Sequence, residues 1–439
     1  MRRGFRFVAL ASLTITCARP APSQMAQPPA ARLTQRPPPS TRTPPKPAAA
    51  SPASTVDNVA SSPGALPAAE SRPLGHFFDA LRALEAHARS QHVRVLWLGD
   101  SHTNADFLSG SVRTELQARF GNGGPGFVRI GSKPYRHDGV KLGRDGSWNI
   151  DPDPPARRTL QDDGVFGLGG TRAVPASGAA FSLQAIASGA DAAAPARFEL
   201  AYTLPPENTF TVELAGKTTR IDAASACEMT PAGVAHLTLT APYGSQLSLK
   251  AVRGTPRLFN AVVERAEPPG VVLDAAGIDG ARLETPLAWN EAAFVAEVAR
   301  RAPELLVVAY GTNEAFDAGK VEKYGPQLQS LVARLRQGAP DASCLVLGPT
   351  DAPLGEASVP RVAEVGDVLR RAAQDIGCSF VSLQQLMGGE GSFALGMKAK
   401  ERLAQPDKLH LTPLGYRTLG QALAARILHA YSAPGDLAL

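Results

Sequence analysis

The chain is poor in aromatic residues, cysteines and long apolar segments. Phe, Trp and Tyr make up 6% of its 439 residues, and none of them lies between residues 18 and 72. Four cysteines in a chain of this size do not form the disulfide framework that stabilises small secreted domains. One apolar run, residues 7–15, stands out, and it is too short to cross a bilayer as a lasting helix. These absences exclude a disulfide-rich scaffold and a protein with several membrane-spanning helices.

The first 17 residues have the layout of a secretory signal. Three arginines precede the apolar run at residues 7–15, so we expect residues 1–17 to be a signal peptide. With such a signal, we expect the protein to be exported and to be periplasmic or associated with the cell envelope. Cys17 resembles the acceptor site of bacterial lipoproteins, although Thr16 occupies a position that usually holds Gly, Ala or Ser. Membrane anchoring through a lipidated Cys17 and plain export both remain open.

Residues 18–72 consist mainly of Ala, Pro, Ser, Thr and Gln. They hold 13 of the 38 prolines in 55 residues. Such a segment cannot bury enough apolar surface to offset the loss of chain entropy on ordering. We therefore predict a disordered tether between the signal and a folded part that begins near residue 73.

The positive charge does not indicate a nucleic-acid partner. The formal net charge is +5 and the isoelectric point is near 9.1. The basic residues are scattered, however, and Arg36, Arg42 and Lys46 lie in the predicted tether. A weak attraction to a polyanionic wall or polysaccharide is the most that this balance predicts.

Beyond the tether, short apolar segments alternate with helical patterns in two separated parts of the chain. Residues 93–98 are mostly apolar, and the run stops at Gly99, as in a buried parallel strand that feeds a helix. We expect strands at 93–98, 271–273, 304–310, 344–347 and 379–383, and helices around 74–84, 108–120, 291–301, 326–336, 361–376 and 413–429. Residues 73–130 and 270–432 therefore predict one α/β domain, a doubly wound five-stranded parallel sheet of the flavodoxin-like kind.

Residues 131–269 interrupt this pattern. They show strand-like pieces of five to seven residues that Gly, Pro, Asn and Asp separate, without a convincing helix. The pieces are residues 181–186, 197–202, 209–214, 236–239 and 246–252. We interpret residues 131–269 as an inserted β-sandwich module.

Cys344 and Cys378 open two strands that we expect to be neighbours in the parallel sheet. Two buried thiols are the simpler expectation, and a disulfide between them is the alternative.

Three strands of the predicted sheet end in short polar motifs. Ser101 ends Gly-Asp-Ser, Gly280 ends Gly-Ile-Asp-Gly, and Asn313 lies in Gly-Thr-Asn-Glu. The carboxyl ends of parallel strands lie at one edge of a sheet, where such folds bind their ligands. We therefore expect these residues to converge although they are far apart in the sequence.

A fourth motif, Asp407-Lys408-Leu409-His410, stands just before the last predicted helix. A carboxylate three residues before a histidine can accept the Nδ1–H of the imidazole, which leaves Nε2 free to take a proton from a serine. Asp and His at this spacing are also metal ligands, but no further cluster in the sequence completes a metal site. Ser101, Asp407 and His410 together predict nucleophilic catalysis without metal or cofactor.

These four motifs resemble the signatures of the SGNH hydrolases, also called GDSL-type esterases. The resemblance covers residues 93–103 and 271–429. It implies that Ser101 is the nucleophile, that His410 is the general base, and that Asp407 orients and charge-stabilises His410.

The same resemblance implies an oxyanion hole, a set of donors that binds the negative oxygen of the reaction intermediate. Its donors are the backbone N–H groups of Ser101 and Gly280 and the side-chain amide of Asn313. Gly277, three residues before Gly280, is an alternative donor. His102 stands where many members have Leu, and we expect it to have no catalytic role.

More closely, Gly-Asp-Ser-His-Thr and Ala-Tyr-Gly-Thr-Asn-Glu-Ala, with a β-rich insert between them, are similar to the peptidoglycan O-acetylesterases. The likeness implies removal of O-acetyl groups from an envelope carbohydrate, with peptidoglycan favoured, and a carbohydrate-binding role for the insert. Two alternatives stay open: a general carboxylesterase or lipase of the same fold, and a non-catalytic wall-binding protein. No apolar lid sequence supports the first, and the intact Ser101, Asp407 and His410 argue against the second.

Overall fold

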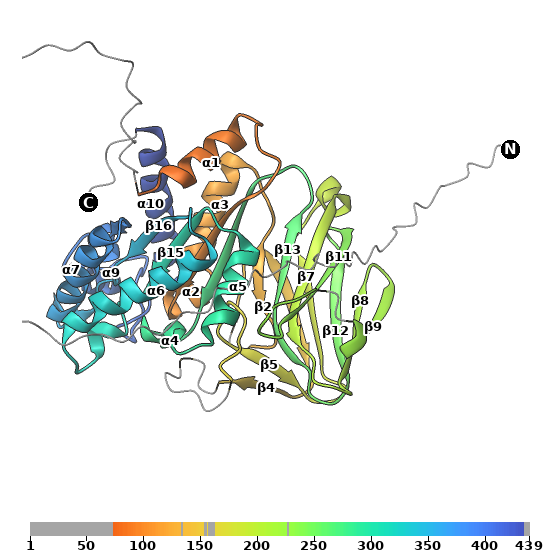
Figure 1. Ribbon diagram of the computed structural model, residues 1–439. Helices are drawn as coiled ribbons and strands as arrows, with labels where there is room; N and C mark the ends of the chain where they lie inside the picture. The colour runs from red at the N-terminus through yellow and green to blue at the C-terminus, as the bar shows by residue number, and fades with distance from the viewer. Residues whose placement is uncertain (1–72, 133–134, 153–155, 157–162, 226–227, 434–439) are drawn as a thin grey trace, which may run out of the picture. The chain divides into compact units, whose positions relative to one another are not determined.

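The computed structural model describes residues 73–132, 135–152, 156, 163–225 and 228–433 (Figure 1). The predicted signal peptide, the tether and the acceptor Cys17 lie outside these residues. Among the described residues, no helix has both the length and the apolar character needed to span a membrane.

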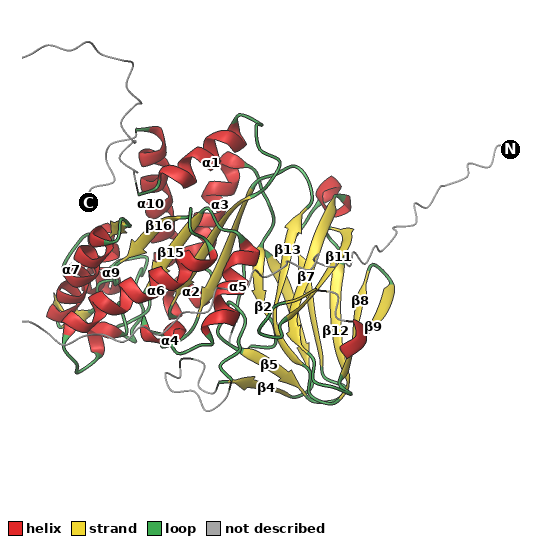
Figure 2. Ribbon diagram, in the orientation of Figure 1, coloured by secondary structure: helices red, strands yellow, loops and turns green. Residues whose placement is uncertain are grey.

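A five-stranded parallel sheet forms the centre of the α/β part (Figure 2). Its strands stand in the order β14 (Val271–Gly277), β1 (Val93–Gly99), β15 (Leu305–Ala309), β16 (Ser343–Leu347) and β19 (Ser379–Val381). Numbered along the chain this order is 2-1-3-4-5, which is the flavodoxin-like order. The predicted fold class is confirmed. β14 extends four residues beyond the predicted segment, to Gly277.

Helices cover both faces of this sheet because its strands are buried on both sides. Val93, Val95 and Trp97 pack with one group of helices, and Leu96 and Leu98 pack with the other. The first group contains α1 (Gly75–Glu85), α3 (Leu108–Phe120), α8 (Leu383–Leu386), α9 (Ser392–Lys398) and α10 (Pro413–Ser432). The second contains α4 (Glu284–Leu287), α5 (Glu291–Arg301), α6 (Tyr324–Gly338) and α7 (Pro360–Asp375). A single turn, α2 (Ser101–Asn104), follows β1 directly, and β17 (Pro353–Leu354) and β18 (Ala357–Ser358) form a small hairpin.

The inserted part consists of two antiparallel sheets around a common apolar core. One sheet has the order β10 (Glu228–Met229), β11 (Ala235–Pro242), β7 (Pro195–Thr203), β13 (Arg257–Arg265), β5 (Arg172–Pro175) and β4 (Trp148–Asp151), and β2 (Gly126–Arg129) also pairs with β13. The other has the order β3 (Val140–Asp145), β6 (Ala180–Ala185), β12 (Gln246–Arg253), β8 (Thr209–Leu214) and β9 (Lys217–Ile221). The predicted β-sandwich is present in this form.

Several strands of the sandwich were not predicted. The longest of them, β13, alternates core-facing Leu258, Ala261 and Val263 with residues such as Phe259, which packs with Ala293 of α5. Because both of its faces are buried, β13 lacks the alternation of polar and apolar residues that marks a half-exposed strand. β2 lies on the α/β side of the predicted boundary at residue 130, yet its hydrogen-bonded partner is β13.

Buried ion pairs join the insert to the parallel sheet. The Arg301 guanidinium donates to Asp274 Oδ2 on β14 at 2.7 Å and to Glu264 Oε1 on β13 at 2.6 Å. Arg94 of β1 donates to the same Glu264 at 2.9 Å. The side chains of Arg301, Asp274 and Glu264 are almost inaccessible to solvent. Strands from both parts of the molecule therefore share one charge cluster.

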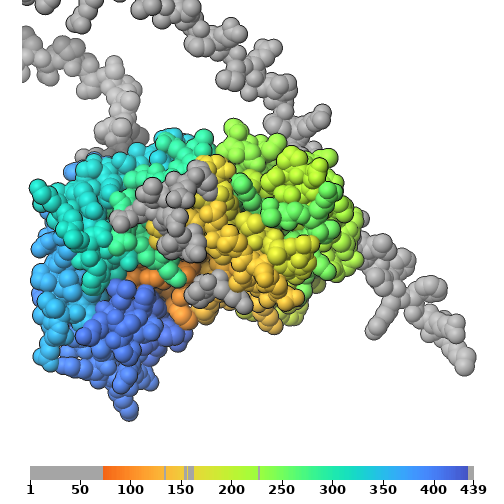
Figure 3. Space-filling model, turned by 90° about the horizontal axis from the view of Figure 1, so that it is seen from below, coloured from red at the N-terminus to blue at the C-terminus, as the bar shows by residue number. Residues whose placement is uncertain are grey.

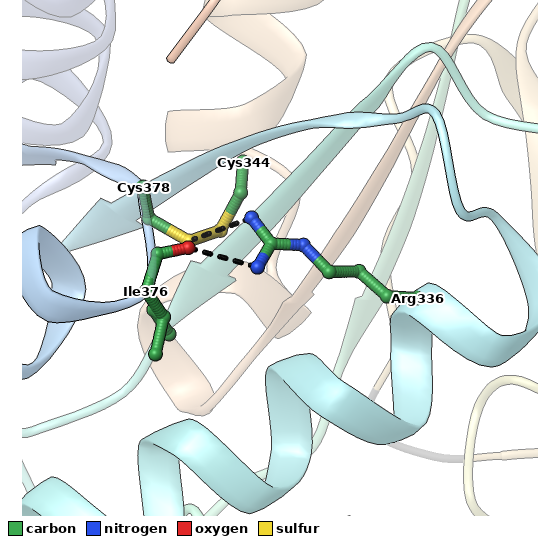
Figure 4. The surroundings of a disulfide bond; sticks show 4 residues. All are labelled: Arg336, Cys344, Ile376 and Cys378. Atoms are coloured by element: carbon green, nitrogen blue, oxygen red, sulfur yellow. Dashed lines mark hydrogen bonds between the residues drawn. A yellow bond between two sulfur atoms is a disulfide. The ribbon is translucent and has the colours of Figure 1, made fainter. Parts of the chain in front are cut away.

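Cys344 and Cys378 form a disulfide at the start of β16 and just before β19 (Figure 4). The expectation of two buried thiols was wrong, because the parallel pairing of β16 and β19 brings the two Cα atoms to 4.7 Å. Arg336 of α6 donates to the carbonyl of Ile376 at 2.8 Å and approaches the sulfur of Cys378 at 3.9 Å.

Candidate active site

The predicted site residues meet in one cavity of about 570 Å³ at the carboxyl ends of β1, β14 and β15. The cavity is lined by Ser101, Asn104, Ala105, Phe107, Tyr135, Arg136, Asp279, Gly280, Asn313, Gln405, Leu409, His410 and Tyr416. Asp407 is not a lining residue, and it contacts the cavity through His410.

Ser101 is the first residue of α2, and only Asp100 separates it from the strand β1. Asp100 caps this turn because its Oδ1 accepts the backbone N–H of His102 at 2.9 Å. Glycine is required at position 99 by close packing, since a Cβ there would lie 2.1 Å from Thr103 Oγ1. The tight turn places Ser101 Oγ 2.8 Å from Nε2 of His410.

Asp407 and His410 are held by a tight loop before α10. Asp407 Oδ1 accepts the backbone N–H groups of Leu409 and His410, each at 3.0 Å. Lys408, which follows Asp407, has a φ of 63°. The other carboxylate oxygen, Oδ2, lies 2.8 Å from His410 Nδ1. Partial burial raises the pKa of Asp407, but the hydrogen bonds from His410 and Leu409 outweigh it, so the net pKa is lowered and the carboxylate stays charged.

Gly280 and Asn313 line the same cavity as Ser101. Nδ2 of Asn313 donates one hydrogen to the carbonyl of Ala281 at 2.9 Å, which fixes the amide plane. Gly280 lines the cavity and has a φ of 74°. Gly277 is not among the lining residues, because its Cα packs against the backbone of Thr103 and Asn104 in α2. This geometry favours Gly280 over Gly277 as the second backbone donor.

His102, for which we expected no catalytic role, lies beside His410. Its ring is buried, and its centroid lies 5.4 Å from that of His410. Nδ1 of His102 lies 2.9 Å from the hydroxyl of Tyr416, and Nε2 lies 3.5 Å from Thr350 Oγ1. Burial and, secondarily, the nearby His410 lower the pKa of His102 to about 3, so His102 is neutral. The neutral ring of His102, hydrogen-bonded to Tyr416, therefore packs beside the imidazole of His410.

Two buried carboxyl groups stand next to lining residues in the sequence, since Asp100 precedes Ser101 and Glu314 follows Asn313. Burial raises the pKa of Asp100 to about 8, and the negative charges of Glu314 and Asp279 act in the same direction. Burial also raises the pKa of Glu314 to about 7, although its two oxygens accept the backbone N–H groups of Leu283 and Gly311.

The insert contributes to the wall of the cavity through Tyr135 and Arg136. Arg129 of β2 supports this region, since it donates to Asn104 Oδ1 at 3.1 Å and to the carbonyl of Gly277. No spacing in the sequence marks Arg129 or Arg136 as neighbours of the site, because the residues that they contact there, Asn104 and Ala105, lie 25 and 31 residues away. In the part of the chain that the structure describes, no group of three or more His, Cys, Asp or Glu side chains could hold a metal ion.

Residues 239–418 match the GDSL-like lipase/acylhydrolase family. This range contains Gly280, Asn313, Asp407 and His410, whereas Ser101 precedes it. No curated protein sequence matches the chain.

Among solved structures, a peptidoglycan O-acetylesterase is 25% identical, and the alignment covers 83% of this chain and 98% of that chain with a TM-score of 0.69. The aligned 83% of the chain exceeds the share that residues 73–130 and 270–432 make up together, so the alignment includes the insert. An acetylxylan esterase from Geobacillus stearothermophilus is 17% identical over 36% of this chain and 72% of that chain, with a TM-score of 0.28. A family two carbohydrate esterase from Clostridium thermocellum is 10% identical over 66% and 99%, with a TM-score of 0.29.

Four observations point to the same kind of protein. They are the flavodoxin-like sheet, the polar motifs at its strand ends, the family match and the likeness to a solved esterase. Residues 239–418 thus carry a GDSL-like lipase/acylhydrolase domain, and the chain resembles SGNH hydrolases, the peptidoglycan O-acetylesterases among them, which supports an ester-bond hydrolase.

Proposed function

We propose that this protein is a serine esterase that removes O-acetyl groups from a cell-envelope carbohydrate, with peptidoglycan as the favoured substrate. The observation that carries the proposal is the continuous contact from Ser101 to His410 to Asp407. Both distances, from Ser101 Oγ to His410 Nε2 and from His410 Nδ1 to Asp407 Oδ2, are 2.8 Å. This is the arrangement that activates a serine for attack on an ester.

In the first half of the proposed reaction, Ser101 Oγ attacks the acetyl carbonyl while His410 Nε2 takes its proton. Asp407 accepts the Nδ1–H and stabilises the imidazolium that forms. The tetrahedral intermediate collapses when the bond to the sugar oxygen breaks, and His410 gives its proton to that oxygen. The deacetylated sugar leaves, and an acetyl group remains on Ser101.

In the second half, water replaces the sugar. His410 takes a proton from the water as the hydroxide attacks the acetyl-serine carbonyl, and a second tetrahedral intermediate forms. Its collapse releases acetate and returns the proton from His410 to Ser101 Oγ.

Three donors stabilise both intermediates in this proposal: the backbone N–H groups of Ser101 and Gly280 and the free amide hydrogen of Asn313. Ser101 stands at the start of a helical turn, where the backbone N–H is not used within the helix. The bond from Asn313 to Ala281 orients the amide before substrate arrives, so little reorganisation is needed during the reaction.

The choice of an acetylated envelope carbohydrate has two supports. The solved peptidoglycan O-acetylesterase shares both the α/β part and the insert with this chain. The signal-like residues 1–17 are consistent with export, and a lipidated Cys17 would hold the enzyme at the membrane. Export and lipid anchoring remain part of the proposal, since these residues lie outside the described structure.

The decisive variant is Ser101→Ala, with Ser248→Ala on the sandwich strand β12 as the matched control. Loss of the nucleophile should lower hydrolysis of 4-nitrophenyl acetate by at least roughly 10⁴-fold, and the control should keep wild-type rates. A fluorophosphonate probe should modify Ser101 in the wild type, as mass spectrometry of the labelled peptide reports. Undiminished hydrolysis by Ser101→Ala would overturn the mechanism.

Acetate release then decides the substrate. We expect faster release from O-acetylated peptidoglycan than from acetylxylan, and little hydrolysis of long-chain esters. A preference for long-chain esters would instead identify a lipase of the same fold. Full inactivity of the wild type on every ester would support a non-catalytic wall-binding protein.

A further inference from the structure

Two of the proposed oxyanion donors come from segments that are far apart in the sequence. The backbone N–H of Ser101 belongs to α2, and that of Gly280 belongs to the loop that follows β14. Donors of an oxyanion hole must lie about 2.7–3.1 Å from the same oxygen atom. A shift of one segment against the other would therefore weaken the hole, and a contact that joins the two segments bears directly on the reaction.

Asn104, the last residue of α2, makes such a contact. Its Nδ2 donates to Asp279 Oδ1 at 2.9 Å, and Asp279 directly precedes Gly280. The N–H of Gly280 belongs to the peptide group that begins at Asp279, so this bond limits how that N–H can turn. On the other side, Arg282 Nη1 donates to the carbonyl of Gly280 at 3.1 Å. The backbone of Gly280 is thus held from both directions.

Arg129 fixes the other end of the Asn104 amide. Arg129 lies on β2, which pairs with β13 of the insert, and its Nη1 donates to Asn104 Oδ1 at 3.1 Å. A guanidinium can only donate, so the amide must present its oxygen to Arg129 and its NH₂ group to Asp279. In Figure 3 the orange surface near residues 100–130 lies between the blue C-terminal part of the chain and the yellow surface of the insert.

The guanidinium of Arg129 is buried, and the three oxygens to which it donates are neutral. They belong to the amide of Asn104 and to the carbonyls of Gly169 and Gly277. Burial lowers the pKa of Arg129, and interactions with Tyr135 and Asp279 oppose this effect. A buried cation that is not bonded to a carboxylate is costly to the fold. Proteins keep such features mainly at functional sites.

We infer that Asn104 is a positioning residue for the oxyanion hole. It connects the buried Arg129 to Asp279 and so fixes the backbone N–H of Gly280 relative to that of Ser101. The inference rests on the proposed function and deepens it, because it gives the sheet of the insert a part in the chemical step through Arg129. Asn104 also lines the cavity, but both ends of its amide are hydrogen-bonded within the protein, so it acts through Asp279.

A double-mutant cycle on the hydrolysis of 4-nitrophenyl acetate tests the bond. Asn104→Ala and Asp279→Ala should each lower kcat about tenfold, which is less than the loss of a whole donor because the donor is only loosened. KM should change by less than about twofold, since the hole acts mainly in the transition state. The double variant should be no slower than either single variant, because all three lack the same bond. Asp279→Asn keeps an oxygen that can accept from Asn104 and should keep kcat near the wild-type value.

Phenylboronic acid supplies a second readout, since it forms a tetrahedral adduct with the hydroxyl of an active serine. Its Ki should rise in Asn104→Ala by the factor by which kcat falls. Asn290→Ala is the matched control: Asn290 Oδ1 accepts the N–H of Ala293 at 3.0 Å, Nδ2 donates to the carbonyl of Asp163 at 3.4 Å, and Asn290 is not a lining residue of the cavity. This variant should lose stability because α5 loses its cap, but it should keep kcat and Ki.

Three outcomes overturn the inference: an unchanged kcat in Asn104→Ala, losses that multiply in the double variant, or a rise in KM without a fall in kcat, which would identify Asn104 as a substrate contact. Asp279 is exposed, so Asp279→Ala tests the same bond even if Asn104→Ala does not fold. Failure of the proposed function is recognised separately, because Ser101→Ala would then keep its activity.

Discussion

At the scale of single residues, the amide of Asn313 has two separate tasks. One hydrogen of Nδ2 is bound by the carbonyl of Ala281, and the other is available in the cavity. The first bond determines where the second hydrogen points. A residue of this kind acts through its orientation, and a side chain of similar size without the amide cannot replace it.

We therefore expect Asn313→Ala to lower kcat on 4-nitrophenyl acetate by about 10²–10³-fold with little change in KM, because an oxyanion donor acts mainly in the transition state. The exposed Asn149 of β4 provides the control variant Asn149→Ala, which should leave kcat unchanged. Steady-state kinetics of both variants measure the effect. A change in KM alone would show that Asn313 binds substrate rather than the intermediate.

Asp100 carries a prediction about stability and pH. Because its pKa is raised from 3.8 to about 8, the folded protein holds a proton that the unfolded chain releases above about pH 4. This contribution makes wild-type stability fall as the pH rises towards 8. Asp100→Asn removes the titration and keeps an oxygen to accept the N–H of His102.

Urea unfolding at pH 5 and pH 8.5 tests this expectation. The stability of Asp100→Asn relative to the wild type should rise by at least about 1.4 kcal/mol between the two values, the equivalent of one pKa unit. Glu314 titrates in both proteins, and because its charge raises the pKa of Asp100, the measured difference includes the coupling between the two groups. A difference that stays constant with pH would show that Asp100 is not protonated in the folded state.

At the scale of secondary-structure elements, the position of Ser101 depends on how closely α2 packs on the ends of β1 and β14. A Cβ at Gly277 would lie 2.3 Å from the backbone nitrogen of Asn104 and 2.7 Å from the carbonyl carbon of Thr103. The clash is with backbone, so no side-chain rotation relieves it. Gly277 thus has a structural role, since it allows α2, which begins at the proposed nucleophile Ser101, to pack this closely.

Gly277→Ala should destabilise the protein by roughly 1–3 kcal/mol through overpacking and displace α2. Because small displacements of a nucleophile are costly, hydrolysis of 4-nitrophenyl acetate should fall by up to about 10²-fold. Gly366→Ala in α7 is the matched control, since its nearest neighbour, Pro349 Cδ, is 4.0 Å away. That variant should be neutral or more stable by about 0.5–1 kcal/mol. Thermal unfolding and kinetics of the two variants should therefore diverge.

At the scale of the whole molecule, the insert and the parallel sheet share buried charges. Arg301 of α5 pairs with Asp274 of β14 and Glu264 of β13, and Arg94 of β1 reaches the same Glu264. Removal of one member leaves uncompensated charge in the interior. We expect the two parts to unfold together in the wild type.

Arg301→Leu should lower the free energy of unfolding by about 3–5 kcal/mol, because Asp274 loses its buried cation, whereas Glu264 keeps Arg94 and Arg197. Arg253→Leu removes an exposed pair and should change it by less than about 1 kcal/mol. Calorimetry of the two variants and the wild type tests the cluster. Equal stability of Arg301→Leu and the wild type would show that the charges do not hold the parts together.

Most of the α/β part could be predicted because its signals are local. The helix α5 begins and ends where its apolar spacing predicts, and Thr412 caps α10 through a bond from the N–H of Gly415 to its Oγ1. Strands of the sandwich such as β13 were missed, since burial on both faces removes the alternation that reveals a strand. The disulfide was misjudged because strand neighbours alone do not determine how two thiols approach.

By itself, the sequence determined the alternation of strands and helices in the α/β part, the fold class and the candidate residues Ser101, His410 and Asp407. It could do so because parallel strands bring their carboxyl ends to one edge, whatever lies between them in the chain. Only the tertiary structure decided that His102 lies against His410, that Gly280 rather than Gly277 lines the cavity, and that Arg136 enters it from the insert. The residues in these contacts lie far apart in the sequence, and no sequence pattern links them. Their distances depend on how the helices, strands and loops that carry them pack together.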